Sequence, residues 1–181
     1  MADPSPDATW CAVGMSELVW SDGLLVEARQ TLAEVAAALA SQGVDGVLEL
    51  TGGASVPGAL TKGDIDLHLR VEPDAFSPVV IRLRAAYPVA GADSWAPTLA
   101  VFDVPAPRAT GLAVTPTGSE HDQRFRLTWQ ALRSDPALLD EYNALKTATV
   151  NTADYEHRKS AFFTRLAAEG ARGQAHHSWE G

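Results

Sequence analysis

Two carboxylates two residues apart, Asp64 and Asp66, are the side chains of this sequence best suited to chemistry. They open the segment 64–71, in which even positions are polar and odd positions are apolar. This alternation predicts a β-strand with both carboxylates on one face and their Cα atoms roughly 6–7 Å apart. Unpaired carboxylates at this spacing repel each other and raise one pKa, and a divalent cation between them removes that penalty. An all-oxygen pair suits Mg²⁺, or Mn²⁺ in its place.

The residues just before this strand are suited to binding phosphate. Gly52–Gly53 lets backbone N–H groups close around an anion, and Lys62 adds a positive charge two residues before Asp64. Together these features indicate phosphoryl chemistry. Both the acid pair and the glycine pair also have a second interpretation. Acids on one face of a strand are typical of a solvated or edge strand, and a glycine pair is typical of a simple turn. His68 shares the acidic face and is expected to be a surface histidine unless it contacts substrate or metal.

The surrounding segments predict a small mixed sheet with helices packed against it. A helix is expected after Ser21 and Asp22, which would cap it, and Gly43 would end it. Three helices are expected in the last third, opening at Ser119, at Asp135–Pro136 and at Thr152. Between these regions we expect a buried strand at 46–50, an irregular loop at 51–63, the strand at 64–71, a helix from 74 or 78 to 87, and strands at 98–104 and 110–115. The fold class is therefore α+β.

The length of 181 residues is enough for one domain with a proper core. We expect this domain at 16–169, with a sheet part at 16–117 and a helical part at 118–169. A flexible arm at 1–15 and a flexible tail at 170–181 would flank it.

The composition excludes several kinds of partner. A formal charge of −9 makes nucleic acid an unsuitable partner, because binding a phosphate backbone needs a clustered positive surface. Cys11 is the only cysteine, so no internal disulfide can form. The N-terminus lacks the pattern of a signal peptide, and no apolar run is long enough for a membrane span. These observations predict a cytoplasmic protein.

The stretch from Gly52 to Val71, GGASVPGALTKGDIDLHLRV, resembles the GrpB family, whose members carry a G-S-T-S-V-P-G-L-x-A-K-P-I-I-D-I type run. Three later stretches, at 132–136, 141–146 and 155–162, are similar to that family's L-R-x-x-P, E-Y-x-x-L-K and Y-x-x-x-K-x-x-F patterns. The resemblance keeps this order and covers about residues 17–168.

The resemblance implies a nucleotidyltransferase-type fold of the polymerase-β-like superfamily, in which a glycine turn and two strand acids hold a metal-bound nucleoside triphosphate. Carried over by position, Asp64 and Asp66 are the catalytic acids and metal ligands. A third acid on a neighbouring strand normally completes such a site. Asp103 is the best candidate by position, with Glu120 behind it, although Asp103 can equally begin the turn before Pro105. The implied nucleotide-binding residues are Gly52, Gly53, Ser55, Lys62, Arg133, Lys146 and Lys159.

The last three of these cations can also be helix-surface charges that pair with Glu141 and Glu156. The sequence further departs from the family pattern near the expected site. Gly53 replaces a usual serine, Gly111 and Ala113 stand in a usually histidine-rich strand, and Trp129–Gln130 replaces an Arg–Asp pair.

Two functions therefore remain open. The first is transfer of a nucleotidyl group from an NTP to a small-molecule acceptor, with release of pyrophosphate. The second is a non-catalytic module that keeps the fold and binds a nucleotide or a partner. A P-loop kinase is disfavoured because the sequence contains no G-x-x-x-x-G-K-[ST] motif.

Overall fold

A four-stranded sheet forms the centre of the molecule in the computed structural model, which describes residues 17–91 and 95–177, with side chains up to 169. Its strands are β2 (Val47–Thr51), β4 (Ile65–Val71), β5 (Ala100–Asp103) and β6 (Thr110–Pro116). They lie in the order β2-β4-β6-β5, with β4 and β6 parallel and both outer pairs antiparallel. The expected arm at 1–15 lies outside the described residues.

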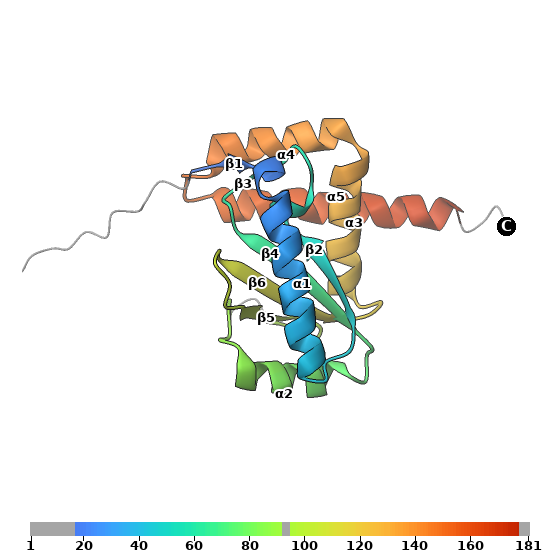
Figure 1. The fold of residues 1–181 in the computed structure, drawn as a ribbon. Coiled ribbons are helices and arrows are strands. Elements are labelled where there is room, and N and C mark those ends of the chain that lie inside the picture. Colours follow the sequence, from blue (N-terminus) through green and yellow to red (C-terminus); the bar gives the residue numbers. More distant parts are fainter. Residues whose placement is uncertain (1–16, 92–94, 178–181) are drawn as a thin grey trace, which may run out of the picture.

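One face of this sheet forms the main core with α1 (Leu25–Ser41) and α2 (Phe76–Ala86). The odd residues of β4, from Ile65 to Val71, are at most 1% exposed and share this core with Leu112 of β6. Figure 1 shows α1 running along the sheet, with α2 at the end of the molecule opposite α4. The alternation in 64–71 thus predicted correctly which face of the strand is buried.

The C-terminal helices α3 (Glu120–Ser134), α4 (Pro136–Thr149) and α5 (Tyr155–His177) form a second core. Their apolar residues pack against the segment between β2 and β4; the buried members of this cluster are Val56, Ala59, Trp129, Leu132, Tyr142, Phe162 and Leu166. Ser119 and Asp135 cap α3 and α4 as predicted, by accepting hydrogen bonds from backbone N–H groups of the first turns. The α+β class is confirmed.

Three local predictions are corrected. Ser21 and Asp22 do not cap α1; they form a 3₁₀ turn (Ser21–Gly23), where Ser21 Oγ donates to the Val56 carbonyl at 2.6 Å. The strand expected to be buried at 46–50 is the edge strand β2, because only β4 pairs with it. Helix α5 also continues through 170, where we expected the domain to end, to His177.

The segment 51–63 contains more structure than its composition predicted. It holds a 3₁₀ turn (Gly53–Ser55) and the short strand β3 (Leu60–Thr61), which pairs with β1 (Val19–Trp20). Asn143 of α4 fixes this segment by accepting from the Leu60 N–H at 2.8 Å and donating to the Gly58 carbonyl at 2.9 Å. The segment 51–63 is therefore held against α4. Among the helices that the structure describes, none is long and apolar enough to cross a membrane.

Candidate functional site

The backbone passes close to a carboxylate where the chain leaves β2. Thr51 lies opposite Asp66 in the register of β2 and β4, and Gly52 follows with a φ of 70°. A Cβ atom on Gly52 would lie 2.0 Å from Asp66 Oδ2, so a side chain there would displace the carboxylate. A Cβ atom on Gly53 would lie 3.3 Å from the Tyr142 hydroxyl. Glycine is therefore required at position 52 by close packing as well as by the turn, whereas position 53 is tightly packed.

A pocket of about 150 Å³, called here the carboxylate pocket, lies between this turn, the start of β4 and the helices α3, α4 and α5. It brings together residues that are far apart in the sequence. Of the predicted site residues, its walls contain Gly52, Gly53, Lys62, Asp64, Asp66, Lys146 and Lys159.

The two carboxylates differ in their surroundings. Asp64 is exposed and accepts a hydrogen bond of 3.3 Å from the Thr61 hydroxyl. Asp66 is half-buried, and no described side chain forms a hydrogen bond or an ion pair with its carboxylate. Burial, and then the neighbouring charge of Asp64, raise the pKa of Asp66 to about 7, against the opposing effect of two lysines. Asp66 is thus an acid whose negative charge the two lysines compensate only in part.

The lysines of the pocket are held in place by other groups. Lys146 is buried, and its Nζ donates to the Leu60 carbonyl at 3.0 Å. Burial lowers the pKa of Lys146 to about 8, although Asp64 acts in the opposite direction. Lys159 pairs with Glu156 at 2.8 Å, and Lys62 lies 3.8 Å from the same carboxylate. The predicted pairing with Glu156 is therefore found for Lys159. Lys159 nevertheless lines the pocket.

Two of the predicted nucleotide-binding residues lie outside the carboxylate pocket. Arg133 Nη2 donates to Ser55 Oγ at 2.9 Å and to the Leu50 carbonyl at 3.3 Å. Ser55 Oγ in turn donates to the Gly52 carbonyl at 2.8 Å. Arg133 and Ser55 therefore brace the glycine turn from behind.

Neither candidate for a third acid reaches the pair. Asp103 is exposed and pairs with Gly111, which itself pairs with Asp66, so one whole strand separates the two acids. Glu120, at the start of α3, lines a different cavity. Among the described residues, no group of three or more His, Cys, Asp or Glu side chains is arranged to hold a metal ion.

Comparison with known proteins shows which family this chain belongs to. The GrpB protein family matches residues 23–169, which is most of the chain. The chain belongs to the GrpB family. A crystal structure of the conserved protein GrpB from Enterococcus faecalis is similar, with a TM-score of 0.66 and 18% identity over 87% of this chain and 99% of that one.

Two structures of the Cid1 poly(U) polymerase are similar at a lower level. The form bound to MgGTP has a TM-score of 0.48 and 15% identity over 67% of this chain and 41% of that one. The form bound to Mg 3'-dATP has a TM-score of 0.47 and 16% identity over 67% and 40%. No curated protein matches the chain.

Aromatic residues also line the carboxylate pocket of this GrpB-family protein, and the sequence had identified none of them as a site residue. Trp129 packs edge-on against Tyr142 and Phe163, with ring centroids 6.1 and 5.1 Å apart. Tyr142 and Tyr155 are buried, and burial raises the pKa of both phenols. The Lys62 ammonium lies 4.2 Å from the centre of the Tyr155 ring. The spacing of these aromatics along their helices cannot reveal that the core they form is also a pocket wall.

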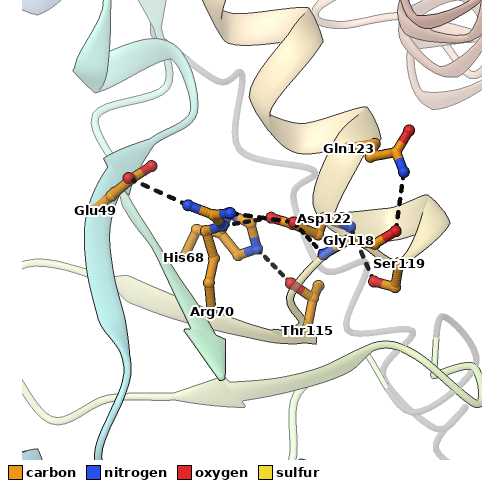
Figure 2. A network of polar contacts seen from close by, with 8 residues as sticks. All are labelled: Glu49, His68, Arg70, Thr115, Gly118, Ser119, Asp122 and Gln123. Carbon is orange, nitrogen blue, oxygen red and sulfur yellow. Dashed lines mark hydrogen bonds and ion pairs between the residues drawn. The ribbon is translucent and has the colours of Figure 1, made fainter. Parts of the chain in front are cut away.

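The second half of the polar face of β4 forms a separate network, drawn in Figure 2. Arg70 donates to both carboxylate oxygens of Asp122, at 2.6 and 3.3 Å, and Asp122 also accepts from the Gly118 N–H at 2.7 Å. His68 forms a hydrogen bond of 2.7 Å with the Thr115 hydroxyl, and its ring stacks on Phe125 at 4.8 Å. The expectation of a surface histidine is wrong, because α3 covers this part of the strand and leaves His68 only 2% exposed.

The charges in this network are compensated. Burial alone would raise the pKa of Asp122, but the hydrogen bonds from Arg70 and Gly118 outweigh it and lower that pKa. Burial lowers the pKa of His68 to about 4, so the ring is neutral at neutral pH. The network therefore attaches α3 to the sheet.

Proposed function

We propose that the carboxylate pocket binds a metal-complexed nucleoside triphosphate and transfers its nucleotidyl group to a small-molecule acceptor. One observation carries this proposal. The half-buried Asp66 carboxylate lies in this pocket beside Asp64, and no described side chain forms a hydrogen bond or an ion pair with it. An acid in this setting favours a cation, and strongly perturbed carboxyls in pockets mark functional sites more often than structural ones.

The donor set fits Mg²⁺ or Mn²⁺. Two carboxylates, with no further ligand among the described side chains, match Mg²⁺, which is commonly bound through one or two carboxylates together with substrate phosphates. Asp64 and Asp66 would hold the ion, which would neutralise phosphate charge during the transfer.

The other residues of the pocket suit the phosphates. The backbone at Gly52 and Gly53 would contact the β and γ phosphates, with Lys62, Lys146 and Lys159 neutralising charge as pyrophosphate leaves. The bond from the acceptor oxygen to the α-phosphorus forms as the bond from that phosphorus to the pyrophosphate oxygen breaks. The departing pyrophosphate keeps the electron pair. Asp64 is exposed, so water beside it can take the acceptor's proton.

The substrates proposed here are small. The acidic chain, with its formal charge of −9, does not favour binding to a nucleic acid backbone. NTPs and small acceptors are abundant in the cytoplasm, where we propose that the protein acts.

A non-catalytic nucleotide-binding module is the second candidate. It is favoured by the position of Asp103, one strand too far from Asp66 to share a ligand with it. In that case the pocket would bind the nucleotide without turnover.

Thermal melting separates these candidates. The wild type is melted with each NTP and Mg²⁺ or Mn²⁺, and compared with Asp66→Asn and with the matched surface control Asp103→Asn. A ligand at a hundred times its dissociation constant stabilises by roughly 2.7 kcal/mol. Both candidates predict a metal-dependent shift that Asp66→Asn abolishes and Asp103→Asn keeps; the absence of a shift with every NTP would refute both. Pyrophosphate release in the presence of cell metabolites then supports the transferase, and a shift without release supports the binding module.

A further inference from the structure

A second cavity, of about 490 Å³, adjoins the carboxylate pocket. It is called here the apolar cavity. Four residues line both spaces: Trp129, Glu156, Lys159 and Phe163. Leu99 and Val101 form its wall on the sheet side, and Phe125 adds a further aromatic surface from α3. Its walls thus suit an apolar molecule that extends away from the carboxylates.

The apolar cavity contains a buried polar group without a partner. Thr128 of α3 is 3% exposed, and its Oγ1 forms no hydrogen bond with any described residue. Rotation about χ1 changes which of the two γ groups, the hydroxyl or the methyl, faces the cavity, and threonine in helices populates two such rotamers. The hydroxyl can therefore turn into the cavity and bond a polar atom of a ligand. Leaving it unpaired costs stability in the free protein.

A positive charge lies at the other end of the apolar cavity. Arg124 precedes Trp129 by five residues on α3, which is roughly 7–8 Å along a helix. Among the described side chains it forms no ion pair, and its guanidinium donates to the Thr164 hydroxyl at 3.5 Å. An anionic group at this end would therefore find an available cation.

The strand order places the apolar cavity on the side from which an acceptor has to approach. The glycine turn follows β2, Asp66 lies on β4, and Val101 lies on β5, two strands further on. An incoming acceptor and the departing pyrophosphate lie on opposite sides of the reacting phosphorus. With the pyrophosphate at the glycine turn, the acceptor comes from the side of β6 and β5. Gly111 of β6 has no side chain to block this path.

We propose that the apolar cavity is the acceptor site, and that the acceptor is a small amphipathic anion. Its apolar body packs against the aromatic and aliphatic walls, its anionic group pairs with Arg124, and its nucleophilic hydroxyl points toward the carboxylate pocket. This inference rests on the function proposed for the neighbouring pocket.

The test measures binding without metal or nucleotide, so that its result is independent of the first proposal. The probe is 4-hydroxyphenylacetate, titrated by ligand-observed NMR against the full chain in EDTA. Its neutral amide, 4-hydroxyphenylacetamide, and acetate serve as matched probes. We expect the carboxylate probe to bind, the amide to bind about fivefold more weakly, and acetate alone to show no binding.

Variants locate the bound probe. Arg124→Gln should remove the preference for the carboxylate probe, whereas Arg126→Gln, on the same helix and outside this cavity, should keep it. Thr128→Val, which keeps the side-chain shape, should weaken binding about 2- to 10-fold. Asp66→Asn should keep probe binding.

The inference is overturned if neither ring probe binds, if both bind equally, or if Arg126→Gln has the same effect as Arg124→Gln. Probe binding by a protein that shows no metal-dependent NTP shift would leave a ligand site but remove its role as acceptor site. An NTP shift without probe binding would overturn only the acceptor assignment.

Discussion

Replacing Asp66 with asparagine should stabilise the metal-free protein at alkaline pH. The native Asp66 carboxyl titrates near pH 7 instead of near its ordinary 3.8, so the folded state holds its proton more tightly than the unfolded state does. For an acid with a raised pKa, stability is lost as the pH rises from about 4 to about 7. Each pKa unit corresponds to about 1.4 kcal/mol, so the full penalty above pH 7 would be about 4 kcal/mol. Because Asp66 is only half-buried, we expect about half of this.

The assay is urea unfolding of wild type and Asp66→Asn in EDTA at pH 5 and pH 8. The asparagine amide carries no charge in either state, so the gain of about 2 kcal/mol at pH 8 should shrink to about two thirds of that value at pH 5. In a melting experiment at pH 8 the same gain is about 4–8 °C for a chain of this size. The stability of the wild type at each pH is compared with that of Asp66→Asn at the same pH. This comparison is needed because His68, with its lowered pKa, makes the stability of both proteins rise between about pH 4 and 6.5 and so partly masks the loss caused by Asp66.

Two results would refute this reasoning. The variant could be no more stable than the wild type at pH 8, or its gain could be equal at both pH values. Asp103→Asn, at an exposed position on the same sheet face, is the control and should change stability little at either pH. Saturating Mg²⁺ should recover part of the lost stability in the wild type and have no effect on Asp66→Asn.

Three further changes test other contacts. Gly52→Ala should destabilise the fold by about 2–4 kcal/mol and abolish nucleotide binding, because the new Cβ meets a carboxylate; Gly23→Ala, with open space around it, is the matched control in urea unfolding. Asp122→Ala should cost about 3 kcal/mol in the same assay at pH 7, because it leaves the partly buried Arg70 with only its 3.8 Å ion pair to Glu49; a loss below 1 kcal/mol would contradict this account. Thr128→Val should raise the stability of the free protein by about 1 kcal/mol in thermal melting, because it removes an unpaired buried hydroxyl; destabilisation would indicate a partner for it.

Local patterns predicted the strand at 64–71 well because its alternation has the period of a strand, and the buried odd residues follow from that period alone. These patterns did not predict which residues contact the polar face of this strand. The partner of Arg70 is Asp122, 52 residues later in the first turn of α3. No spacing rule connects the two, so the burial of His68 beneath α3 could not be derived from its neighbours in the chain.

The third acid shows the same limit for sheet order. The family resemblance implied Asp103 as a third acid on a strand next to that of Asp66, and in the structure Asp103 lies on the same sheet face but one strand further away. Whether it reaches Asp66 depends on which strand lies between them, and that follows from the tertiary order β2-β4-β6-β5. The lysines behaved differently. Lys146 and Lys159 were implied by the position of whole motifs, which carry information about tertiary contacts, and both line the carboxylate pocket.

The charged residues on the polar face of β4 are arranged differently at its two ends. At its C-terminal end, Arg70 and Asp122 compensate each other and attach α3, so the network adds to the stability of the fold. At its N-terminal end, Asp66 lies beside a second acid, and no described side chain forms an ion pair with it. A neutral residue at position 66 would remove the penalty and leave the strand intact. The protein therefore carries at this one position a destabilisation that its own fold does not require, as expected where stability is given up for binding. A bound cation would compensate the charge that α3 compensates at the other end of the same strand.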